Sequence, residues 1–412
     1  METAPRGTRM HIAIFGRRNA GKSSLINALT DQEVAIVSSV AGTTTDPVFK
    51  SMEILPIGPC VLIDTAGIDD VGELGSRRIE RTMWVLRKTD IGIIVVDPES
   101  GFGEYEHDLL EKLQRFEIPA IGVINKVDVH PEVALLKRKM SACGLPVLEV
   151  SALKKHGVDE LKKLIIENEP KEWIKHTVLG DIISAGDVVV LVVPIDSSAP
   201  KNRIILPQVQ AIRDVLDHNA ITFVTKETEL SLTLQKLKQK PKIVITDSQA
   251  VREAVRATPP DVLFTTFSIL FARYKGDLNT LVDGAAAIRE LRPGDSVLIA
   301  EACTHHTQAE DIGKVKIPRW LRQFAGGDLN FNWLRGGDFS EDLSPYKLIV
   351  HCGACMINRK EMLYRISRSQ ESGVPIVNYG VLIACVNGYL HRALSPFPEL
   401  QVKVDTHLKL VL

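Results

Sequence analysis

Short apolar runs alternate with amphipathic stretches along the first 165 residues of the chain. The apolar runs are of strand length and rich in Val and Ile, whereas the stretches between them repeat apolar residues at helical spacing. This alternation predicts a mostly parallel sheet with helices on both faces. The predicted strands are His11–Phe15, Val61–Ile63, Ile91–Val96, Ala120–Ile124 and Val147–Val150, and the predicted helices include Ser23–Leu29, Arg77–Leu86 and Asp108–Phe116.

Two further α/β segments follow a charged linker at Glu167–Lys175. The second segment begins with the apolar run Asp187–Pro194. The third begins near Pro259 and contains the predicted strands Ser296–Ala300 and Lys347–Val350. We therefore expect an α/β chain of three domains, at residues 1–172, 173–262 and 263–412. The small second domain carries no catalytic constellation, and it is the natural place for the chain to form a homodimer.

Composition and charge narrow the setting in which the chain acts. The longest apolar runs, such as Val188–Val193, are far shorter than a membrane span, and residues 1–9 lack the apolar stretch of a signal peptide. These features predict a cytoplasmic protein that does not enter a membrane. The net charge of −1 gives no broad electrostatic footprint for nucleic acid. Six cysteines in a reducing compartment do not indicate a disulfide framework.

A glycine-rich phosphate loop follows the first predicted strand and opens a predicted helix. The segment Gly16–Ser23 matches the pattern G-x-x-x-x-G-K-[ST] in the strand-to-helix context that the motif requires. Its backbone N–H groups can approach phosphate oxygens, Lys22 can reach the β- and γ-phosphates, and the Ser23 hydroxyl is the expected Mg²⁺ ligand. The predicted nucleotide-binding residues in this region are Gly16, Asn19, Ala20, Gly21, Lys22, Ser23 and Ser24.

Two later motifs can complete the Mg²⁺ and γ-phosphate site. Gly42-Thr43-Thr44-Thr45 offers a threonine to the Mg²⁺ ion, and we choose Thr44 over Thr43. In Asp64-Thr65-Ala66-Gly67, Asp64 can hold Mg²⁺ through water, and the Gly67 N–H can sense the γ-phosphate. We therefore predict Lys22, Thr44, Asp64 and Gly67 as the catalytic residues.

Two further motifs read the base. Asn125-Lys126-Val127-Asp128 ends a predicted strand, and the Asp128 carboxylate can accept two hydrogen bonds from guanine that adenine cannot supply. Ser151-Ala152 closes the base pocket, with the Ala152 N–H facing the guanine oxygen. Five motifs in this order predict a GTP-hydrolysing domain, which we call the G domain.

The G domain resembles that of the tRNA-modification GTPases over residues 9–170, through GRRNAGKSSLINAL, AGTTTD and DTAG. In that family the asparagine matching Asn19 helps to hold a K⁺ ion beside the phosphates; a loop hydrogen bond is the alternative role. Position 68 is Ile, where Ras-type enzymes carry a water-orienting glutamine, so unassisted hydrolysis could be as slow as about 10⁻⁴ s⁻¹. A K⁺ ion, a carboxylate such as Glu73, or a partner can compensate.

Cysteines and histidines cluster after two predicted strands near the end of the chain. Cys303 and His305 follow the strand Ser296–Ala300, and His351-Cys352-Gly353-Ala354-Cys355 follows the strand Lys347–Val350. Open α/β sheets place ligands at the carboxyl ends of their strands, so the two clusters predict a shared metal site. Three cysteines and a histidine suit either a structural Zn²⁺ ion or an iron–sulfur cluster, and spacing does not distinguish the two.

A G domain followed by Cys-x-His and a distant His-Cys-x-x-Cys resembles the iron–iron hydrogenase maturation GTPases over the whole chain. The resemblance implies a 4Fe–4S cluster on Cys303, Cys352 and Cys355, with His305 or His351 as candidate fourth ligand. It also implies a scaffold or carrier that receives a di-iron precursor made with two radical-SAM maturases and delivers it to the apo-hydrogenase. The alternatives are a K⁺-activated GTPase of RNA modification and a GTPase with a structural zinc domain.

Overall fold

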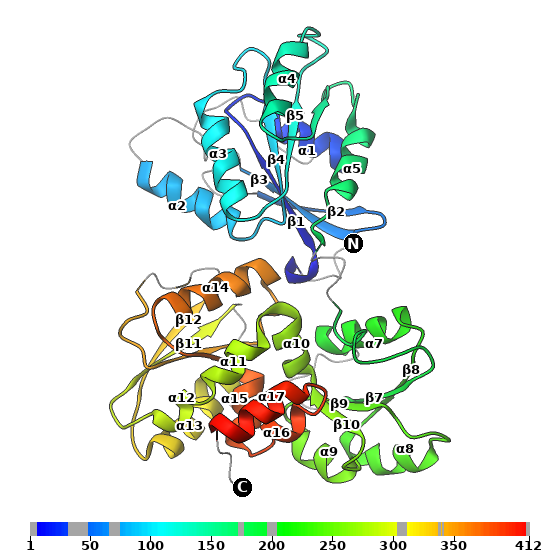
Figure 1. The fold of residues 1–412 in the computed structure, drawn as a ribbon, viewed down its shortest axis with the longest axis vertical. Helices are drawn as coiled ribbons and strands as arrows, with labels where there is room; N and C mark the ends of the chain where they lie inside the picture. Colours follow the sequence, from blue (N-terminus) through cyan, green and yellow to red (C-terminus); the bar gives the residue numbers. More distant parts are fainter. Residues whose placement is uncertain are drawn as a thin grey trace. The chain divides into compact units, whose positions relative to one another are not determined.

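The apolar runs of the first 165 residues form the strands of one sheet in the computed structural model of the chain. The structure describes residues 6–31, 48–65, 75–171, 177–195, 204–302, 311–336, 339 and 342–408. The chain divides into two compact units, Met1–Lys175 and His176–Leu412, and each is considered by itself (Figure 1).

The first unit is a six-stranded sheet in the order β2-β3-β1-β4-β5-β6. All neighbouring pairs are parallel except β2 and β3. Its strands are β1 (Met10–Phe15), β2 (Val48–Ile54), β3 (Gly58–Asp64), β4 (Ile91–Val96), β5 (Ala120–Ile124) and β6 (Val147–Glu149). Its helices are η1 (Arg6–Thr8), α1 (Lys22–Thr30), α2 (Gly75–Leu86), α3 (Glu104–Arg115), α4 (Ala134–Ala142) and α5 (Val158–Glu167).

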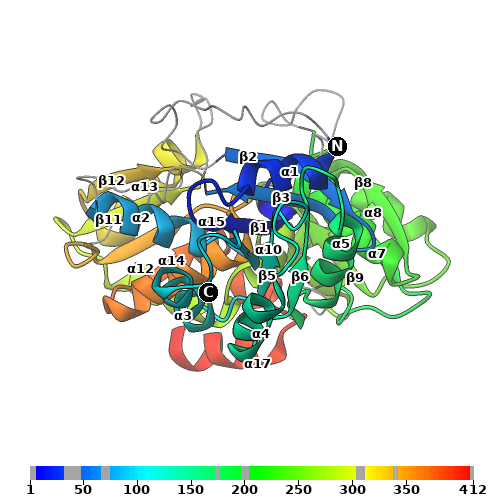
Figure 2. The same ribbon diagram turned by 90° about the horizontal axis from the view of Figure 1, so that it is seen from above.

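Helices cover both faces of this sheet, which is why β1 and β4 are buried along their whole length. Ile12 and Ile14 belong to a core with α1 and α5, whereas Ala13 and Phe15 belong to a core with α2, α3 and α4. Figure 2 shows α1 and α3 on opposite sides of β1. The predicted α/β class and the mostly parallel first sheet are confirmed.

The second unit contains two parallel four-stranded sheets, in the orders β10-β9-β7-β8 and β12-β11-β13-β14. The first sheet consists of β7 (Val188–Val192), β8 (Ile221–Thr225), β9 (Ile243–Thr246) and β10 (Leu263–Thr266), with helices α7 (Leu206–Asp217), η2 (Glu227–Glu229), α8 (Leu230–Lys236) and α9 (Val251–Ala257). The second consists of β11 (Ser296–Glu301), β12 (Asn330–Arg335), β13 (Leu348–His351) and β14 (Ile376–Asn378). The remaining helices are α10 (Phe267–Lys275), α11 (Leu278–Gly284), α12 (Ala287–Glu290), the π-helix η3 (Ile312–Lys316), α13 (Ile317–Ala325), α14 (Arg359–Glu371), α15 (Tyr379–Val386), α16 (Leu390–Ala393), α17 (Pro398–Lys403) and the π-helix η4 (Val404–Leu408).

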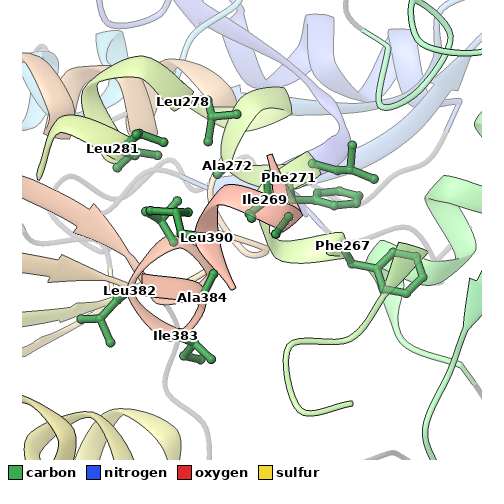
Figure 3. Close-up of a cluster of buried hydrophobic side chains, with 14 of the residues drawn as sticks. Phe267, Ile269, Phe271, Ala272, Leu278, Leu281, Leu382, Ile383, Ala384 and Leu390 are labelled. Atoms are coloured by element: carbon green, nitrogen blue, oxygen red, sulfur yellow. The ribbon is translucent and has the colours of Figure 1, made fainter. Parts of the chain in front are cut away.

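One continuous hydrophobic core runs through both sheets of the second unit. The helix α10 follows β10 directly, and its apolar residues pack with those of α11, α15 and α16 (Figure 3). Ile269 and Leu281 are fully buried in this cluster, as is Leu382. The two sheets are therefore joined by packing as well as by sequence.

The sequence did not predict the strands β2, β10 and β12. The edge strand β2 mixes exposed residues with the buried Met52 and Ile54, and the edge strand β12 has no buried residue, so both lack the uniform apolar signal of the buried strands. Because β10 pairs with β9, the first sheet of the second unit extends past residue 262, where we placed a domain boundary. The division into three domains stays a prediction. Within the described residues, no helix is both long and apolar enough to span a bilayer.

Candidate nucleotide and metal sites

The phosphate loop connects the buried strand β1 to α1, and two of its glycines are required by close contacts. A Cβ atom on Gly16 would lie 2.2 Å from the carbonyl oxygen of Val95, and one on Gly21 would lie 2.2 Å from Nδ2 of Asn125. Both glycines also have positive φ, at 146° and 90°. The loop therefore lies directly against β4 and the base-reading motif, with its backbone free of side-chain obstruction.

The predicted Mg²⁺ ligands lie together beside this loop. The Ser23 hydroxyl donates a hydrogen bond to Oδ2 of Asp64 at 2.7 Å, across the adjacent ends of α1 and β3. Nζ of the buried Lys22 donates to the carbonyl oxygens of Gly16 and Arg17. The Lys22 ammonium is thus held inside the curve of the loop, where the phosphates of a nucleotide would lie.

Asn125 joins the phosphate loop to the base-reading loops. Its Nδ2 donates to the carbonyl oxygen of Ala20 at 3.0 Å, and its Oδ1 accepts from the Ala152 N–H at 3.1 Å. The side chain is almost fully buried. The side-chain amide of Asn125 therefore fixes the phosphate loop and the predicted base-binding loop relative to one another.

Asp128 and Ser151 form the other side of the predicted guanine site. The Ser151 hydroxyl donates to Oδ1 of Asp128 at 2.7 Å, and this bond holds the pKa of the Asp128 carboxyl below its usual value. A carboxylate that stays ionised remains a pure acceptor, which is the role that guanine recognition requires. Lys126 forms an ion pair with Asp97.

Glu106 supports the phosphate loop in a way that we did not predict from the sequence. Its buried carboxylate accepts from Nε and Nη2 of Arg17 at 2.8 and 3.0 Å, and from the Gly103 N–H at 2.8 Å. The same residue therefore caps α3 and grips the loop through a bidentate ion pair. Because the N-cap residue is Gly103, the sequence does not show the Ser/Thr-x-x-Glu pattern of a capping box, and the pairing of Glu106 with Arg17 depends on the fold.

Several predicted residues lie outside the described parts of the chain, and their roles stay predictions. These residues are Thr43, Thr44, Gly67, Ile68, Glu73, Cys303 and His305. Asn19, the candidate K⁺ ligand, is exposed on the phosphate loop in a left-handed conformation that asparagine tolerates.

The two strands that precede the cysteine clusters are neighbours in one sheet, as predicted. β11 and β13 pair in parallel with Ala300 opposite His351, so their carboxyl ends meet at one edge. The Ala302 N–H donates to Sγ of Cys352 at 3.1 Å. The residue next to Cys303 in the sequence is therefore in contact with Cys352.

Neither Cys352 nor Cys355 forms a disulfide, and both residues are partly exposed. Burial raises the pKa of the Cys352 thiol, while the N–H groups of Ala302 and Ala354 favour its thiolate. Such N–H donors to sulfur are a recognised means of tuning thiolate ligands of a metal. Two partly exposed cysteines, with backbone N–H donors at the Cys352 sulfur, fit a soft metal centre.

His351 is placed differently from the cysteines. It is fully buried, and Arg365 donates to its Nε2 from 3.1 Å, which leaves Nδ1 to donate to the Cys352 carbonyl oxygen at 2.8 Å. Burial and the Arg365 charge lower its pKa to about 3. Arg365 is in turn paired with the buried Glu361 at 3.1 Å. Because both ring nitrogens have partners, this geometry argues against His351 as the fourth cluster ligand.

A buried lysine that we did not predict from the sequence binds the backbone of residues 352–357, which we call the cysteine loop. Nζ of Lys275 donates to the carbonyl oxygens of Ala354, Cys355 and Ile357 at 3.1, 3.4 and 2.8 Å. Lys275 is 2% exposed, and its burial lowers its pKa to about 8. It ends α10, so the helix that leaves the first sheet of the second unit reaches the cysteine loop of the second sheet.

Two protein-family models match the second unit, one for each of its two sheets. A model described as the hydrogen maturase F dimerization domain matches residues 178–276, and one described as the hydrogen maturase F tetramerization domain matches residues 279–396. Together they cover more than half of the chain. The chain belongs to the hydrogen maturase F family. The predicted relationship to hydrogenase maturation GTPases is thereby confirmed.

A third model, described as a 50S ribosome-binding GTPase, matches residues 11–126. The tRNA modification GTPase MnmE of Chromobacterium violaceum is 37% identical over 159 residues, covering 38% of this chain and 34% of the relative. GTPase Der of Mycoplasmopsis pulmonis is 34% identical over 187 residues, covering 42% of this chain and 43% of the relative. The chain thus spans less than half the length of these curated relatives. Their likeness, with the family match, makes the N-terminal unit of this hydrogen maturase F chain a GTP hydrolase.

Among solved structures, Era of Aquifex aeolicus (a single-substitution variant bound to GDP·AlF4⁻) is similar, with a TM-score of 0.36 and 21% sequence identity. The matched region covers 60% of this chain and 97% of the Era chain.

Proposed function

We propose that the chain is a GTPase that acts as scaffold or carrier for the di-iron subcluster of iron–iron hydrogenase. In this proposal its C-terminal region holds a 4Fe–4S cluster on Cys303, Cys352 and Cys355. Two radical-SAM maturases supply the di-iron precursor, and the apo-hydrogenase receives it. The observation that carries the proposal is the meeting of β11 and β13, with the Ala302 N–H on the Cys352 sulfur.

The surroundings of the described cysteines suit an iron–sulfur cluster. Neither cysteine forms a disulfide, both residues are partly exposed, and backbone N–H groups reach the Cys352 sulfur. The Lys275 ammonium beneath the loop lies close enough to interact with both thiolates. When bound, the cluster would supply an iron with a labile or exchangeable ligand, since three cysteines leave one iron without a thiolate. With His351 engaged by Arg365, His305 is the better imidazole candidate for that position.

The G domain would use its own residues to bind and hydrolyse Mg·GTP. Ser23 and Asp64 already face one another at the proposed Mg²⁺ position, and Lys22 lies within the phosphate loop. The Asp128 carboxylate would accept from guanine while Asn125 holds Ala152 in place. Because Ile68 cannot orient a water molecule, we expect slow turnover that serves as a switch.

We further propose that the first sheet of the second unit joins two copies of the chain. Its edge strand β8 pairs only with β7 among the described strands and exposes Ile221, Phe223 and Val224 by 48, 41 and 50%. An exposed edge strand with apolar side chains is a template for pairing with another strand. The match to a dimerization domain over residues 178–276 supports this assignment.

Anaerobic reconstitution with iron and sulfide tests the proposal. We expect about four irons per chain, with an EPR signal after reduction. Cys303→Ala, Cys352→Ala and Cys355→Ala should each lower the iron content and alter the signal, whereas Cys143→Ala, at a partly exposed cysteine of the G domain, should not. An intact signal in all three site variants would refute the site. One tightly bound zinc and no cluster would favour the structural zinc domain instead.

The K⁺ role of Asn19 is tested separately. If Asn19 helps to hold K⁺ beside the phosphates, GTP hydrolysis should be faster in K⁺ than in Na⁺, and Asn19→Ala should remove the difference. Equal rates in the two salts would leave Asn19 with a loop hydrogen bond alone.

A further inference from the structure

A cavity of about 330 Å³ lies in the second unit, apart from the cysteine loop. It opens at the carboxyl edge of the sheet β10-β9-β7-β8, where Ser248 follows β9 and Thr266 ends β10. Trp320 of α13 and Tyr389, just before α16, also line it. The carboxyl edge is where parallel α/β sheets bind their ligands, and the volume is within the range of small-molecule sites.

Three cations line this cavity. Arg252 comes from α9, Lys316 from η3 and Arg319 from α13. None of the three forms an ion pair with a carboxylate in the part of the chain that the structure describes, whereas Arg322, further along α13, pairs with Asp328 at 3.2 Å. Glu253 is the one acidic residue among the described residues of the lining. The cavity therefore has an excess of positive charge.

The other lining groups favour a ligand with both a polar and a planar part. Trp320 and Tyr389 offer aromatic faces, and Ile383 and Ala384 of α15 add an apolar wall. The lining hydroxyl groups of Ser248 and Thr266 are both hydrogen-bonded to the hydroxyl of Ser268, at 2.6 and 3.0 Å, and Ser268 itself is not part of the lining. Hydroxyl donors beside Arg and Lys suit a phosphate, and aromatic faces suit a ring.

We propose that this cavity binds a small organic phosphate whose ring stacks against Trp320. A phosphate monoester carries a charge near −2 at neutral pH, which matches the excess of cations better than a single carboxylate does. Arg319 and Lys316 bind the phosphate from one side and Arg252 from another. The site is independent of both the nucleotide site of the G domain and the cysteines.

Equilibrium binding to the full chain tests this site, with the G domain first saturated with Mg·GDP. AMP is the probe, because it joins a phosphate to a planar ring. We expect saturable AMP binding, with adenosine and inorganic phosphate each at least about tenfold weaker, since each keeps only half of the contacts. Binding should quench tryptophan fluorescence, and Trp320→Phe should remove most of that quenching.

Two variants and a control locate the site. Arg319→Ala and Arg252→Ala should each weaken AMP binding by about tenfold or more. Arg256→Ala is the matched control, because Arg256 is an exposed residue one turn further along α9 that does not line the cavity. All three variants should keep GTP hydrolysis and iron content, so the result is separate from the proposed scaffold function. No saturable AMP binding, or equal binding by the Arg319→Ala and Arg256→Ala variants, would overturn the proposal.

Discussion

Buried polar side chains hold both sites together at the scale of single residues. Asn125 connects the phosphate loop to Ala152, Glu106 grips Arg17, and Lys275 binds three carbonyl oxygens of the cysteine loop. Each replaces water with hydrogen bonds to the protein, as a buried polar group must. These residues set the geometry of the loops that carry the chemistry.

Replacing Lys275 should disturb the cysteine loop. Lys275→Met keeps the length of the side chain but leaves three buried carbonyl oxygens without their donor, at a cost of about 2 kcal/mol in stability. We expect less iron per chain after anaerobic reconstitution and a broadened EPR signal. Lys238→Met, at an exposed lysine of the same unit, is the control. Iron content and EPR lines equal to the parent chain would show that Lys275 does not position this loop.

Replacing Asp128 should change which base the G domain accepts. Asp128→Asn exchanges an acceptor for a donor, so guanine loses two charge-assisted hydrogen bonds and GTP affinity should fall roughly 100-fold. Xanthosine triphosphate, which has an oxygen in place of the guanine amino group, should bind this variant better than GTP does. Competition binding of the two nucleotides measures the preference, with Asp108→Asn as control. A variant that still prefers GTP would contradict the assigned role of Asp128.

The nucleotide-binding residues could be predicted from the sequence because each belongs to a short motif with fixed residue spacing. Ser23, Asp64, Asn125 and Asp128 come together as the order of the motifs requires. Lys275 could not be found this way, because a single lysine at the end of an apolar helix carries no spacing signal. For His351 the motif spacing was misleading. It placed this histidine among the candidate metal ligands but gave no indication of the buried Arg365 that binds its ring.

At the scale of elements, the apolar runs predicted the central strands and missed three edge strands, β2, β10 and β12. β1, β4 and β7 are buried on both faces, so composition alone marks them. β12 lies at an edge and has no buried residue, and β10 is an edge strand that ends in two threonines, Thr265 and Thr266. Strand order and pairing partners depend on long-range contacts that a local pattern does not encode.

The exposed strand β8 gives a test at this scale. Phe223→Lys places a charge on the apolar edge, which should prevent association of two copies through β8. Light scattering should then report the mass of one chain where the parent chain shows an oligomer. Leu135→Lys is the control, since Leu135 is 84% exposed on α4 of the other unit. An unchanged oligomeric mass in the Phe223 variant would move the interface elsewhere.

At the scale of the whole molecule, a GTPase unit is joined to a unit that carries the cysteines. If the nucleotide acts as a switch in the proposed delivery, its state must alter the release of the proposed di-iron cargo. The family match supports the connection to hydrogenase maturation. How the nucleotide state would reach the cysteines depends on conformational changes, which one static structure does not contain.

A cluster-transfer assay to apo-hydrogenase tests this coupling. We expect activation to be at least about fivefold faster with GTP than with a non-hydrolysable analogue, the lower end of ordinary allosteric coupling. Lys22→Ala, which should not bind GTP tightly, should show the same slow rate with both nucleotides. Equal rates with the two nucleotides in the parent chain would separate hydrolysis from delivery.

The helix α10 has a consequence for how such a chain can evolve. It starts without a loop at the end of β10 and finishes at Lys275 under the cysteine loop, within a core that both sheets share. A recombination breakpoint anywhere in this helix would expose apolar surface on both fragments and strip the loop of its lysine. Breakpoints within α10 are therefore disfavoured, whereas one between the two units would leave the hydrophobic cores of each unit intact.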